Sequence, residues 1–359
     1  MQVLQTLGKG AYGEVHLAKT VDQRLCAIKS LPRAKSDRQR GYQRLEIGLH
    51  ARLTGHPYIV QLERVVRDDH HTHLVLEYAP EGDLFSAITE RDLFAGNHPL
   101  IRRVFLQLLD AVQHCHDHGV YHRDLKSENI LVFDGGRTVK LADFGLATMD
   151  PISKDYGCGS TFYYSPECQG DLSKRQQQQQ RVGYATAPND VWALGVVLIN
   201  LAAGRNPWRQ ASLQDETFRA YLADPDLLLK ILPISRELNH ILKRIFCIDP
   251  LRRIDLQQLR EKIQQCRFFT RTAEVDRWER IQDLQRMLPI TPPSSLTDLS
   301  SPPTSFLPSP PTVKTMPFVD PLPSPPSTPR GTSKRSTSSH DTLATPNASS
   351  ASLVMPLLI

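Results

Sequence analysis

The chain has 359 residues, of which 40% are apolar, and its net charge is +5 from 43 basic and 38 acidic residues. This length allows one large two-lobed domain with a tail, and the scattered basic residues argue for a soluble protein and against a nucleic-acid ligand. The six cysteines form no CxxC pair. They therefore favour a reduced, intracellular protein over a disulfide framework.

No segment predicts a membrane location. The most apolar run, 191–204, is too short and too interrupted to span a bilayer, so we predict a buried helix. The Lys-Arg pair at 334–335 is too short for a convincing nuclear signal. We therefore expect a cytoplasmic and/or nuclear location with no membrane partner.

The first 80 residues predict a small sheet with a glycine-rich turn. GKGAYGEV places Gly8, Gly10 and Gly13 between two strand-like runs. Glycines let the backbone close over phosphates, where a Cβ would collide. A strand follows this turn, whereas a dinucleotide-binding turn would lead into a helix, so we predict a β-hairpin lid. Since the chain begins only seven residues before Gly8, we expect an incomplete first strand or a misassigned start.

One helix interrupts this sheet, and it carries a candidate counter-ion. Leu45, Leu49 and Leu53 recur at every fourth position and predict an inward stripe. Lys29 lies in a predicted strand, and a buried lysine needs a counter-ion, which Glu46 beside the stripe can supply. The alternative is that Glu46 is a solvated helix carboxylate.

Two polar segments of this region have plain interpretations. HHTH, 70–73, lies between two strand-like runs and is expected to be an exposed turn. RAKSDRQR, 33–40, could dock a phosphorylated segment, but a solvated approach to the helix is favoured.

From residue 100 the pattern becomes helical. Apolar residues fall on one stripe that closes at Gly119, namely Ile101, Val104, Phe105, Leu108, Leu109 and Val112. Five polar motifs then follow in chain order: YHRDLKSENI at 121–130, LADFGLA at 141–147, GCGSTFYYSPE at 157–167, DVWALG at 190–195 and DPLRR at 249–253.

Composition changes near residue 290. Fifteen of the 27 prolines lie from 292 onward among many Ser and Thr, so we predict that 291–359 is disordered. Its Ser-Pro and Thr-Pro steps could be phosphorylated or bind regulators, although a passive tail is an equal alternative.

Two further segments have simple interpretations. RQQQQQR, 175–181, predicts a solvated loop insertion. Residues 277–288 predict a helix with Trp278, Ile281, Leu284 and Leu288 near one face.

The order and spacing of these motifs resemble eukaryotic protein kinases over residues 1–266. The resemblance implies an α+β, two-lobed kinase fold, with a small β-rich N-lobe over 1–79 and a larger helical C-lobe over 80–266. We expect a helical extension over 267–290 before the tail. By the same resemblance HCHDH, 114–118, is favoured as ordinary packing over a metal site.

The resemblance also implies roles for individual residues, with ATP and Mg²⁺ as cofactors. Asp124 would accept the proton of the substrate hydroxyl, Lys126 would neutralise the transferring phosphoryl group, and Asn129 and Asp143 would hold Mg²⁺. Leu76 would be the gatekeeper, and Glu77 to Ala79 would bind adenine. The implied ATP-binding residues are Gly8, Gly10, Gly13, Val15, Ala27, Lys29, Glu46, Glu77 and Ala79, and the implied structural residues are Arg123, Asp190 and Arg253.

The resemblance to protein kinases also implies which residue accepts the phosphate and which sequence precedes it. Lys126 lies two residues after Asp124, as in Ser/Thr kinases, so protein Ser or Thr would be the acceptor. Asp83 and Glu128 match acidic positions that bind an upstream arginine in basophilic relatives, whereas Asn200 replaces a third acid. We therefore expect a preference for Arg three residues before the acceptor.

GCGSTFYYSPE would be the end of the activation segment, where the peptide lies. Ser160 would contact Asp124 and Lys126, and Glu167 would pair with Arg253. Relatives often carry a phosphothreonine at the position of Tyr156, able to pair with Arg123. Because this chain has Tyr156 beside Asp155, we expect activity without phosphorylation of the activation loop.

Several stretches, including GCGSTFYYSPECQG and APNDVWALGVVLINLAAGRNPW, are similar to the fungal family of the fission-yeast repressor of conjugation and meiosis and its budding-yeast relatives. This resemblance implies nutrient or developmental signalling. The glutamine insertion and the tail depart from the pattern. The leading hypothesis is an active Ser/Thr kinase, and the competing one is a catalytically silent scaffold that acts through its peptide groove and tail.

Overall fold

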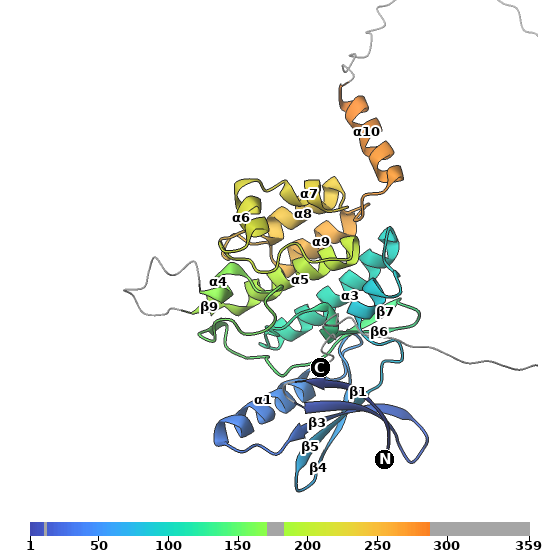
Figure 1. Ribbon diagram of the computed structural model, residues 1–359, viewed down its shortest axis with the longest axis vertical. Helices are drawn as coiled ribbons and strands as arrows, with labels where there is room; N and C mark the ends of the chain where they lie inside the picture. The colour runs from blue at the N-terminus through green and yellow to red at the C-terminus, as the bar shows by residue number, and fades with distance from the viewer. Residues whose placement is uncertain (11–12, 171–182, 288–359) are drawn as a thin grey trace, which may run out of the picture. The chain divides into compact units, whose positions relative to one another are not determined.

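The computed structural model describes residues 1–10, 13–170 and 183–287. The predicted glutamine insertion and the predicted disordered tail lie outside these described residues. The described part has the predicted two lobes, a strand-rich N-terminal lobe and a helical one (Figure 1).

The N-terminal lobe is a five-stranded antiparallel sheet with strand order β1-β2-β3-β5-β4. Lys29 of β3 is paired with Val15 of β2 and with Leu74 of β5, which puts these three side chains on one face of the sheet. The elements of this lobe are β1 (Gln2–Gly10), β2 (Gly13–Lys19), β3 (Leu25–Pro32), α1 (Asp37–Leu53), β4 (Leu62–Arg67) and β5 (His71–Glu77).

Helix α1 begins after Ser36, whose side chain accepts a hydrogen bond from the Gln39 N–H and so caps the first turn. Its inward face differs from the predicted leucine stripe. Leu45 is 39% exposed, whereas Glu46 is only 7% exposed. Leu49 and Leu53 are buried as predicted, and only Leu45 differs, because Glu46, the partner of Lys29, takes the inward place one position later.

The prediction of a turn over HHTH was wrong for three of its four residues. Strand β5 begins at His71, so only His70 lies in the turn that follows Asp68. The segment was misjudged because its histidines lack the β-branched pattern of a strand, while their pairing with β3 stabilises the extended form.

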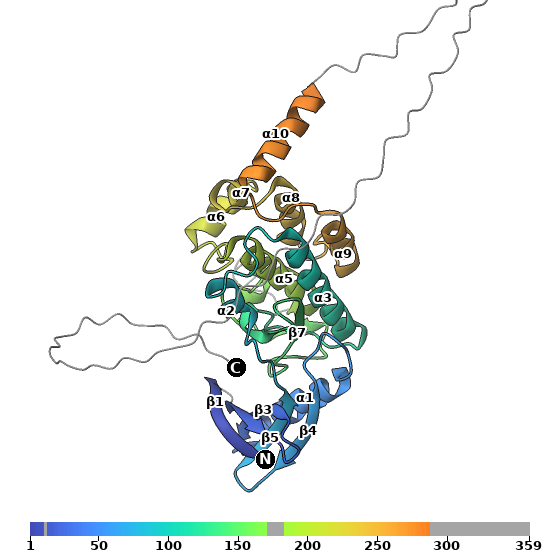
Figure 2. The ribbon, with the colours of Figure 1, turned by 90° about the vertical axis from the view of Figure 1, so that its right-hand side faces the viewer.

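The helical lobe is built around α3 and α5, which lie side by side in both views (Figures 1 and 2). All six residues of the predicted stripe on α3 are buried, at 1% exposure or less. The helices of this lobe are α2 (Leu84–Thr89), α3 (His98–Asp117), α4 (Pro166–Gln169), α5 (Thr186–Ala203), α6 (Glu216–Ala223), α7 (Leu227–Ile231), α8 (Arg236–Ile245), α9 (Leu256–Gln265) and α10 (Ala273–Met287).

Helix α5 contains the most apolar run of the sequence. Among the described residues it is the one helix with the length and composition of a membrane span, but 83% of that window is buried inside the protein. It is therefore a buried helix of this lobe, as its sequence predicts.

Residues 78–83 connect β5 to α2, and short strands and turns after α3 carry the polar motifs. A 3-10 turn, η1 (Ser127–Asn129), leads into the hairpin of β6 (Ile130–Phe133) and β7 (Thr138–Leu141). The pair of β8 (Ile152–Ser153) and β9 (Tyr184–Ala185) fixes the start of the activation segment against the entry to α5.

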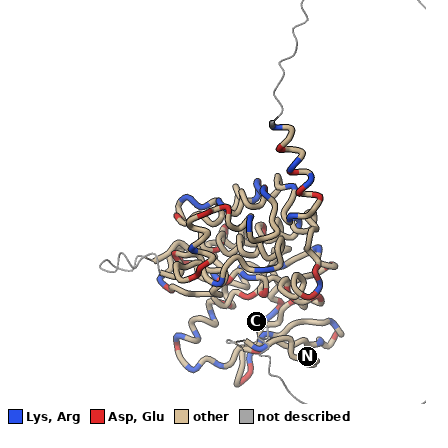
Figure 3. Tube along the Cα trace, turned by 45° about the horizontal axis from the view of Figure 1, so that its top comes forward, with Lys and Arg blue, Asp and Glu red and all other residues tan. Residues whose placement is uncertain are grey.

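Helix α10 packs only partly onto the helical lobe. The Trp278 ring lies 5.2 Å from the Phe268 ring, whereas Ile281 and Leu284 are 52% and 65% exposed. Basic and acidic residues are interspersed along this helix and through both lobes (Figure 3).

Candidate active site

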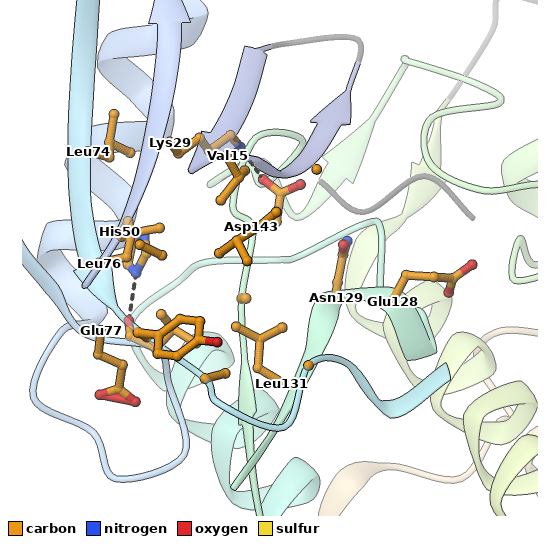
Figure 4. A pocket seen from close by; sticks show the side chains of 18 of the residues that line it. Val15, Lys29, His50, Leu74, Leu76, Glu77, Glu128, Asn129, Leu131 and Asp143 are labelled. Atoms are coloured by element: carbon orange, nitrogen blue, oxygen red, sulfur yellow. Dashed lines mark hydrogen bonds and ion pairs between the residues drawn. The ribbon is translucent and has the colours of Figure 1, made fainter. Parts of the chain in front are cut away.

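A cavity of about 270 Å³ lies where the sheet meets the η1–β6 segment (Figure 4). Most of the residues predicted to contact a nucleotide line it: Gly8, Val15, Ala27, Lys29, Glu46, Glu77, Ala79, Asn129 and Asp143. Gly10 and Gly13 do not line it, although both belong to the same hairpin.

The walls of this cavity suit a flat apolar ring. Val15 and Ala27 come from the sheet, and Leu131 of β6 comes from the other lobe. Glu77 turns its carboxylate away from the cavity, where it pairs with Lys140 Nζ at 2.5 Å (Figure 4). The backbone from Glu77 to Ala79 is left as the polar edge of the cavity.

The glycine-rich hairpin needs Gly13 for close packing. A Cβ at this position would lie 2.3 Å from the carbonyl oxygen of Ser30, so a larger residue would push β2 away from β3. Ala11 and Tyr12, which follow Gly10 in the sequence, lie outside the described residues.

Lys29 is held between two carboxylates inside the cavity. Its Nζ atom lies 2.8 Å from Glu46 Oε1 and 2.7 Å from Asp143 Oδ1. Burial acts against the charged ammonium, but the carboxylates of Asp143 and Glu46 outweigh it and hold the pKa of Lys29 above its ordinary value. The lysine is therefore a fixed cation that points at the space where phosphates would lie.

The two carboxylates respond differently to this site. Burial raises the pKa of Glu46 despite the neighbouring ammonium. Burial also acts against ionised Asp143, but Lys29 and the Gly145 N–H together hold the pKa of Asp143 below its ordinary value. Asp143 is therefore the better anionic ligand of the pair.

Asp124 is the centre of a second polar cluster, on the segment of residues 121–130, which we call the catalytic loop. Ser160 Oγ donates to Asp124 Oδ1 at 2.9 Å, and Lys126 Nζ lies 2.9 Å from Asp124 Oδ2. Lys126 also donates to Ser160 Oγ at 3.2 Å. A hydroxyl group is thus already held at hydrogen-bond distance from both the carboxylate and the ammonium.

Asn129 and Asp143 fit a divalent cation. The Asn129 Nδ2 group donates to the Asp124 backbone carbonyl at 2.9 Å, which orients the amide. Its Oδ1 atom is buried and has no hydrogen-bond partner among the described residues. Asp143 has a φ of 61°, a backbone conformation that is costly outside glycine and is typical of functional positions. Two oxygen ligands of this kind suit a hard ion such as Mg²⁺.

The carboxylate of Asp190, in α5, holds the catalytic loop through hydrogen bonds. This carboxylate accepts the N–H groups of His122 and Arg123, each at 2.9 Å, and lies 3.0 Å from His116 Nε2. The HCHDH segment therefore supports this buried carboxylate through His116. Arg123 has a φ of 65°, and the two hydrogen bonds to Asp190 hold the turn in that conformation.

Arg123 reaches the start of the activation segment. Its guanidinium donates to the Leu146 carbonyl at 2.7 Å, to Ser153 Oγ at 3.0 Å and to Asp155 Oδ2 at 3.2 Å. Tyr156 does not take part in this cluster, because its hydroxyl accepts the Gly183 N–H at 3.0 Å. A carboxylate thus occupies the place expected for a phosphate.

The far end of the activation segment is held by a bidentate ion pair. Arg253 donates to Glu167 Oε1 at 2.5 Å and to Glu167 Oε2 at 3.0 Å. The guanidinium also lies 4.9 Å from the ring centre of Trp192, and its side chain is 1% exposed. Such a pair fixes both the position and the orientation of the segment.

The three positions compared with basophilic kinases have different surroundings. Asp83 is 1% exposed and its carboxylate caps α2 through the Ser86 N–H at 2.7 Å, and burial raises its pKa. Glu128 is half-buried and accepts from Ser127 Oγ at 3.1 Å. Asn200 accepts from the Tyr163 hydroxyl at 3.0 Å, so the position is neutral and occupied.

Sequence reasoning missed His50, which lines the cavity behind Leu76 (Figure 4). The His50 ring lies 5.0 Å from the Phe144 ring, which in turn lies 5.2 Å from the His122 ring. Its Nε2–H donates to the Val60 carbonyl at 2.7 Å. A signal existed, because His50 follows Glu46 by four residues and so shares its inward face.

Comparison with known proteins places this site in a family. The protein kinase domain family matches residues 1–263. The chain is 48% identical over 286 residues to the Schizosaccharomyces pombe protein called negative regulator of sexual conjugation and meiosis, covering 76% of this chain and 61% of that protein.

Two further relatives are kinases by name. Serine/threonine-protein kinase VHS1 of Saccharomyces cerevisiae is 37% identical over 232 residues, covering 63% of this chain and 50% of its own length. Serine/threonine-protein kinase ksp1 of Schizosaccharomyces pombe is 36% identical over 273 residues, covering 73% of this chain and 56% of its own. The chain therefore spans 50% to 61% of the length of these three relatives.

Proposed function

The chain belongs to the protein kinase family, among Ser/Thr kinases, and from this premise we propose that it transfers the γ-phosphoryl group of ATP, with Mg²⁺, to Ser or Thr of protein substrates. The observation that carries the proposal is that the fixed cation Lys29 and the Asn129 amide oxygen, which has no partner among the described residues, line one cavity. The Asn129 amide also donates to the Asp124 carbonyl, which places the Asp124–Lys126 pair beside this cavity. Phosphoryl transfer depends on such positioning and charge neutralisation more than on covalent help.

Each of these groups has one task in the proposed reaction. Lys29, fixed by Glu46, holds the α- and β-phosphates, and the backbone of Glu77 to Ala79 holds the adenine. Asp124 takes the proton of the acceptor hydroxyl, and Lys126 balances the charge of the transferring group. Asn129 and Asp143 would hold Mg²⁺, which supplies charge neutralisation on the phosphate oxygens when bound.

The test is transfer of labelled phosphate from Mg²⁺-ATP to a basic Ser/Thr peptide by the purified chain. Asp143→Asn and Asp124→Asn should each abolish transfer. Arg252→Ala changes an exposed residue that does not line the cavity, so it should leave transfer intact and serves as the matched control. Equal signal from the wild type and both site variants would favour the silent scaffold.

We also propose a preference for arginine upstream of the acceptor, bound chiefly by Glu128. Its carboxylate is only half-buried, whereas Asp83 is committed to capping α2. A peptide array should show Arg enriched three residues before the acceptor, and Glu128→Gln should reduce that enrichment. A flat array, or one unchanged by Glu128→Gln, would contradict this assignment.

The signalling context is a proposal supported by the relatives' names. Since one of them is called a negative regulator of sexual conjugation and meiosis, we propose nutrient or developmental signalling for this chain, in the cytoplasm or nucleus. We further propose that its partners are proteins, both substrates and regulators of the tail, and that nucleic acid and membranes are not ligands. Deletion of the gene followed by scoring of conjugation and sporulation tests the pathway.

A further inference from the structure

A cluster of metal-ligating side chains lies on the N-terminal lobe, outside the candidate active site. It consists of Asp68, in the turn after β4, and of His71 and His73 in β5. The side chains of His71 and His73 are on the face of β5 opposite to Leu74 and Leu76, whose side chains line the cavity. His71 and His73 are therefore on the same outer face of the sheet.

We propose that Asp68, His71 and His73 form a binding site for one divalent transition-metal ion such as Zn²⁺. Two imidazoles and one carboxylate are the ligand types that such ions prefer, whereas Mg²⁺ prefers oxygen ligands alone. The site is therefore chemically distinct from the one formed by Asn129 and Asp143.

The spacing of the three side chains fits a single ion. Their candidate ligand atoms all lie within 4.8 Å of one another. In a tetrahedral zinc site, bond lengths near 2.1 Å put ligand atoms about 3.4 Å apart. His73 Nε2 lies 2.8 Å from Asp68 Oδ2, and His71 Nδ1 lies 3.9 Å from Asp68 Oδ1. The two distances involve different oxygens of the one carboxylate, so each imidazole already lies beside Asp68, and an ion that binds there would draw the three ligand atoms closer together.

The backbone fixes the carboxylate in place. Asp68 Oδ1 accepts the N–H groups of His70 and His71 at 2.7 Å and 2.6 Å. Oδ2 is left facing His73. The turn between β4 and β5 is also hydrogen-bonded to the segment before α1, because the Arg33 N–H donates to the His70 carbonyl at 2.6 Å.

His73 also has the outer partner that a metal-bound histidine usually has. Its Nδ1 atom lies 2.8 Å from Ser30 Oγ, and this contact leaves Nε2 directed at Asp68. A partner on the second ring nitrogen sets the tautomer and the ring orientation of a ligating histidine. The fourth coordination position would face solvent, since the side chains of Asp68 and His71 are 52% and 43% exposed.

The test is metal titration of the full chain, purified without a histidine tag, stripped with a chelator and kept in excess Mg²⁺. Calorimetry should show one equivalent of Zn²⁺ bound. Co²⁺ should give the visible absorption of a tetrahedral site, which Zn²⁺ then removes. Thermal unfolding should shift upward with Zn²⁺.

Substitutions of single residues test which side chains bind the metal ion. His71→Ala and His73→Ala should each abolish the one-equivalent binding, and Ser30→Ala should weaken it about tenfold, the usual effect of losing an outer partner. His70→Ala is the matched control, because His70 lies in the same exposed turn without belonging to the cluster, and it should bind as the wild type does.

Three outcomes would overturn the proposal. They are no bound equivalent in the wild type, unchanged binding in a folded His71→Ala/His73→Ala variant, and loss of binding in His114→Ala, which would move the site to the HCHDH segment. Each variant should transfer phosphate with Mg²⁺-ATP at the wild-type rate, which shows that the protein is folded.

Discussion

Asp155 is the residue that most directly bears on how this kinase is activated. It pairs with Arg123 at 3.2 Å, and Ser153 Oγ supports the same guanidinium at 3.0 Å. A carboxylate there can order the activation segment by the same charge pairing that a phosphate supplies. We therefore predict that phosphatase-treated protein keeps its activity.

Substitution of Asp155 checks this prediction. Because its side chain is 68% exposed, the pair is worth at most about 1 kcal/mol, so Asp155→Asn should lower kcat about two- to fivefold. Asp155→Glu should retain the wild-type kcat. Loss of all activity on phosphatase treatment, restored by phosphate on Ser160 or Thr161, would contradict the prediction.

His50 predicts a pH dependence of stability. Burial lowers the pKa of His50 to about 4, although the Val60 carbonyl and Asp143 act in the opposite direction. The unfolded chain, with an ordinary histidine pKa near 6.5, then binds more protons than the folded chain between these values. Stability from neutral His50 is therefore complete above about pH 6.5 and is lost as the pH falls towards 4.

Urea unfolding of the wild type and of His50→Gln measures this effect. Between about pH 8 and pH 5 the wild type should lose about 2 kcal/mol more of unfolding free energy than the variant does, as follows from the two pKa values. The glutamine amide can still donate to the Val60 carbonyl. Parallel curves for the two proteins would show that His50 does not titrate in this way.

At the residue scale, the sequence motifs locate the polar residues in and beside the cavity but not the neighbours that line it with them. Lys29, Asp124, Asn129 and Asp143 lie in short motifs whose order alone identifies them. His50 lies in no motif. Its place in the cavity depends on how α1 packs against Phe144, a tertiary contact that one sequence does not reveal.

At the scale of elements, the activation segment depends on the ion pair of Glu167 and Arg253. Arg253→Ala should lower the free energy of unfolding by about 3 to 5 kcal/mol, because it leaves the Glu167 carboxylate in a largely buried position without its partner. Chemical unfolding measures the change.

The neighbouring arginine offers a control for this substitution. Arg252 is exposed, so Arg252→Ala should change the free energy of unfolding by less than about 0.5 kcal/mol. Arg253→Lys keeps the charge but cannot donate two parallel hydrogen bonds to the carboxylate. Its loss of unfolding free energy should therefore lie between those of Arg253→Ala and Arg252→Ala. Equal stability of all three variants would mean that the pair does not hold the segment.

The sequence predicted helices better than short strands. The stripe on α3 repeats over three turns and is unambiguous, whereas α1 has a mixed face on which Leu45 was mistaken for a core residue. The start of β5 at His71 depends on pairing with β3, which local propensity cannot indicate.

At the scale of the whole molecule, the described residues contain a complete hydrophobic core. Its largest cluster runs from Leu49 to Phe269 and joins α1 to the helical lobe. The described residues up to Met287 also belong to one compact unit. We predict that a protein ending at 287 unfolds at the same temperature as the full chain, measured by calorimetry. A large drop in that temperature would show that later residues stabilise the kinase domain.

The two-lobed fold was predictable because the motifs occur in the order that kinases share, and the family match over residues 1–263 agrees. The proposed boundaries of the extension and the tail stay predictions. Helix α10 lies within the predicted extension, but Ile281 and Leu284 have little to pack against in the described residues, so their pattern alone could not place the helix.

The contact between Arg123 and Asp155 has a consequence for how a signal could end. A phosphate on an activation segment can be removed within minutes by another enzyme, whereas a carboxylate built into the chain cannot. An output that depends on this pair would last as long as the polypeptide itself. The duration of that output would then be set by synthesis and degradation of the protein, or by a molecule that binds over the candidate active site.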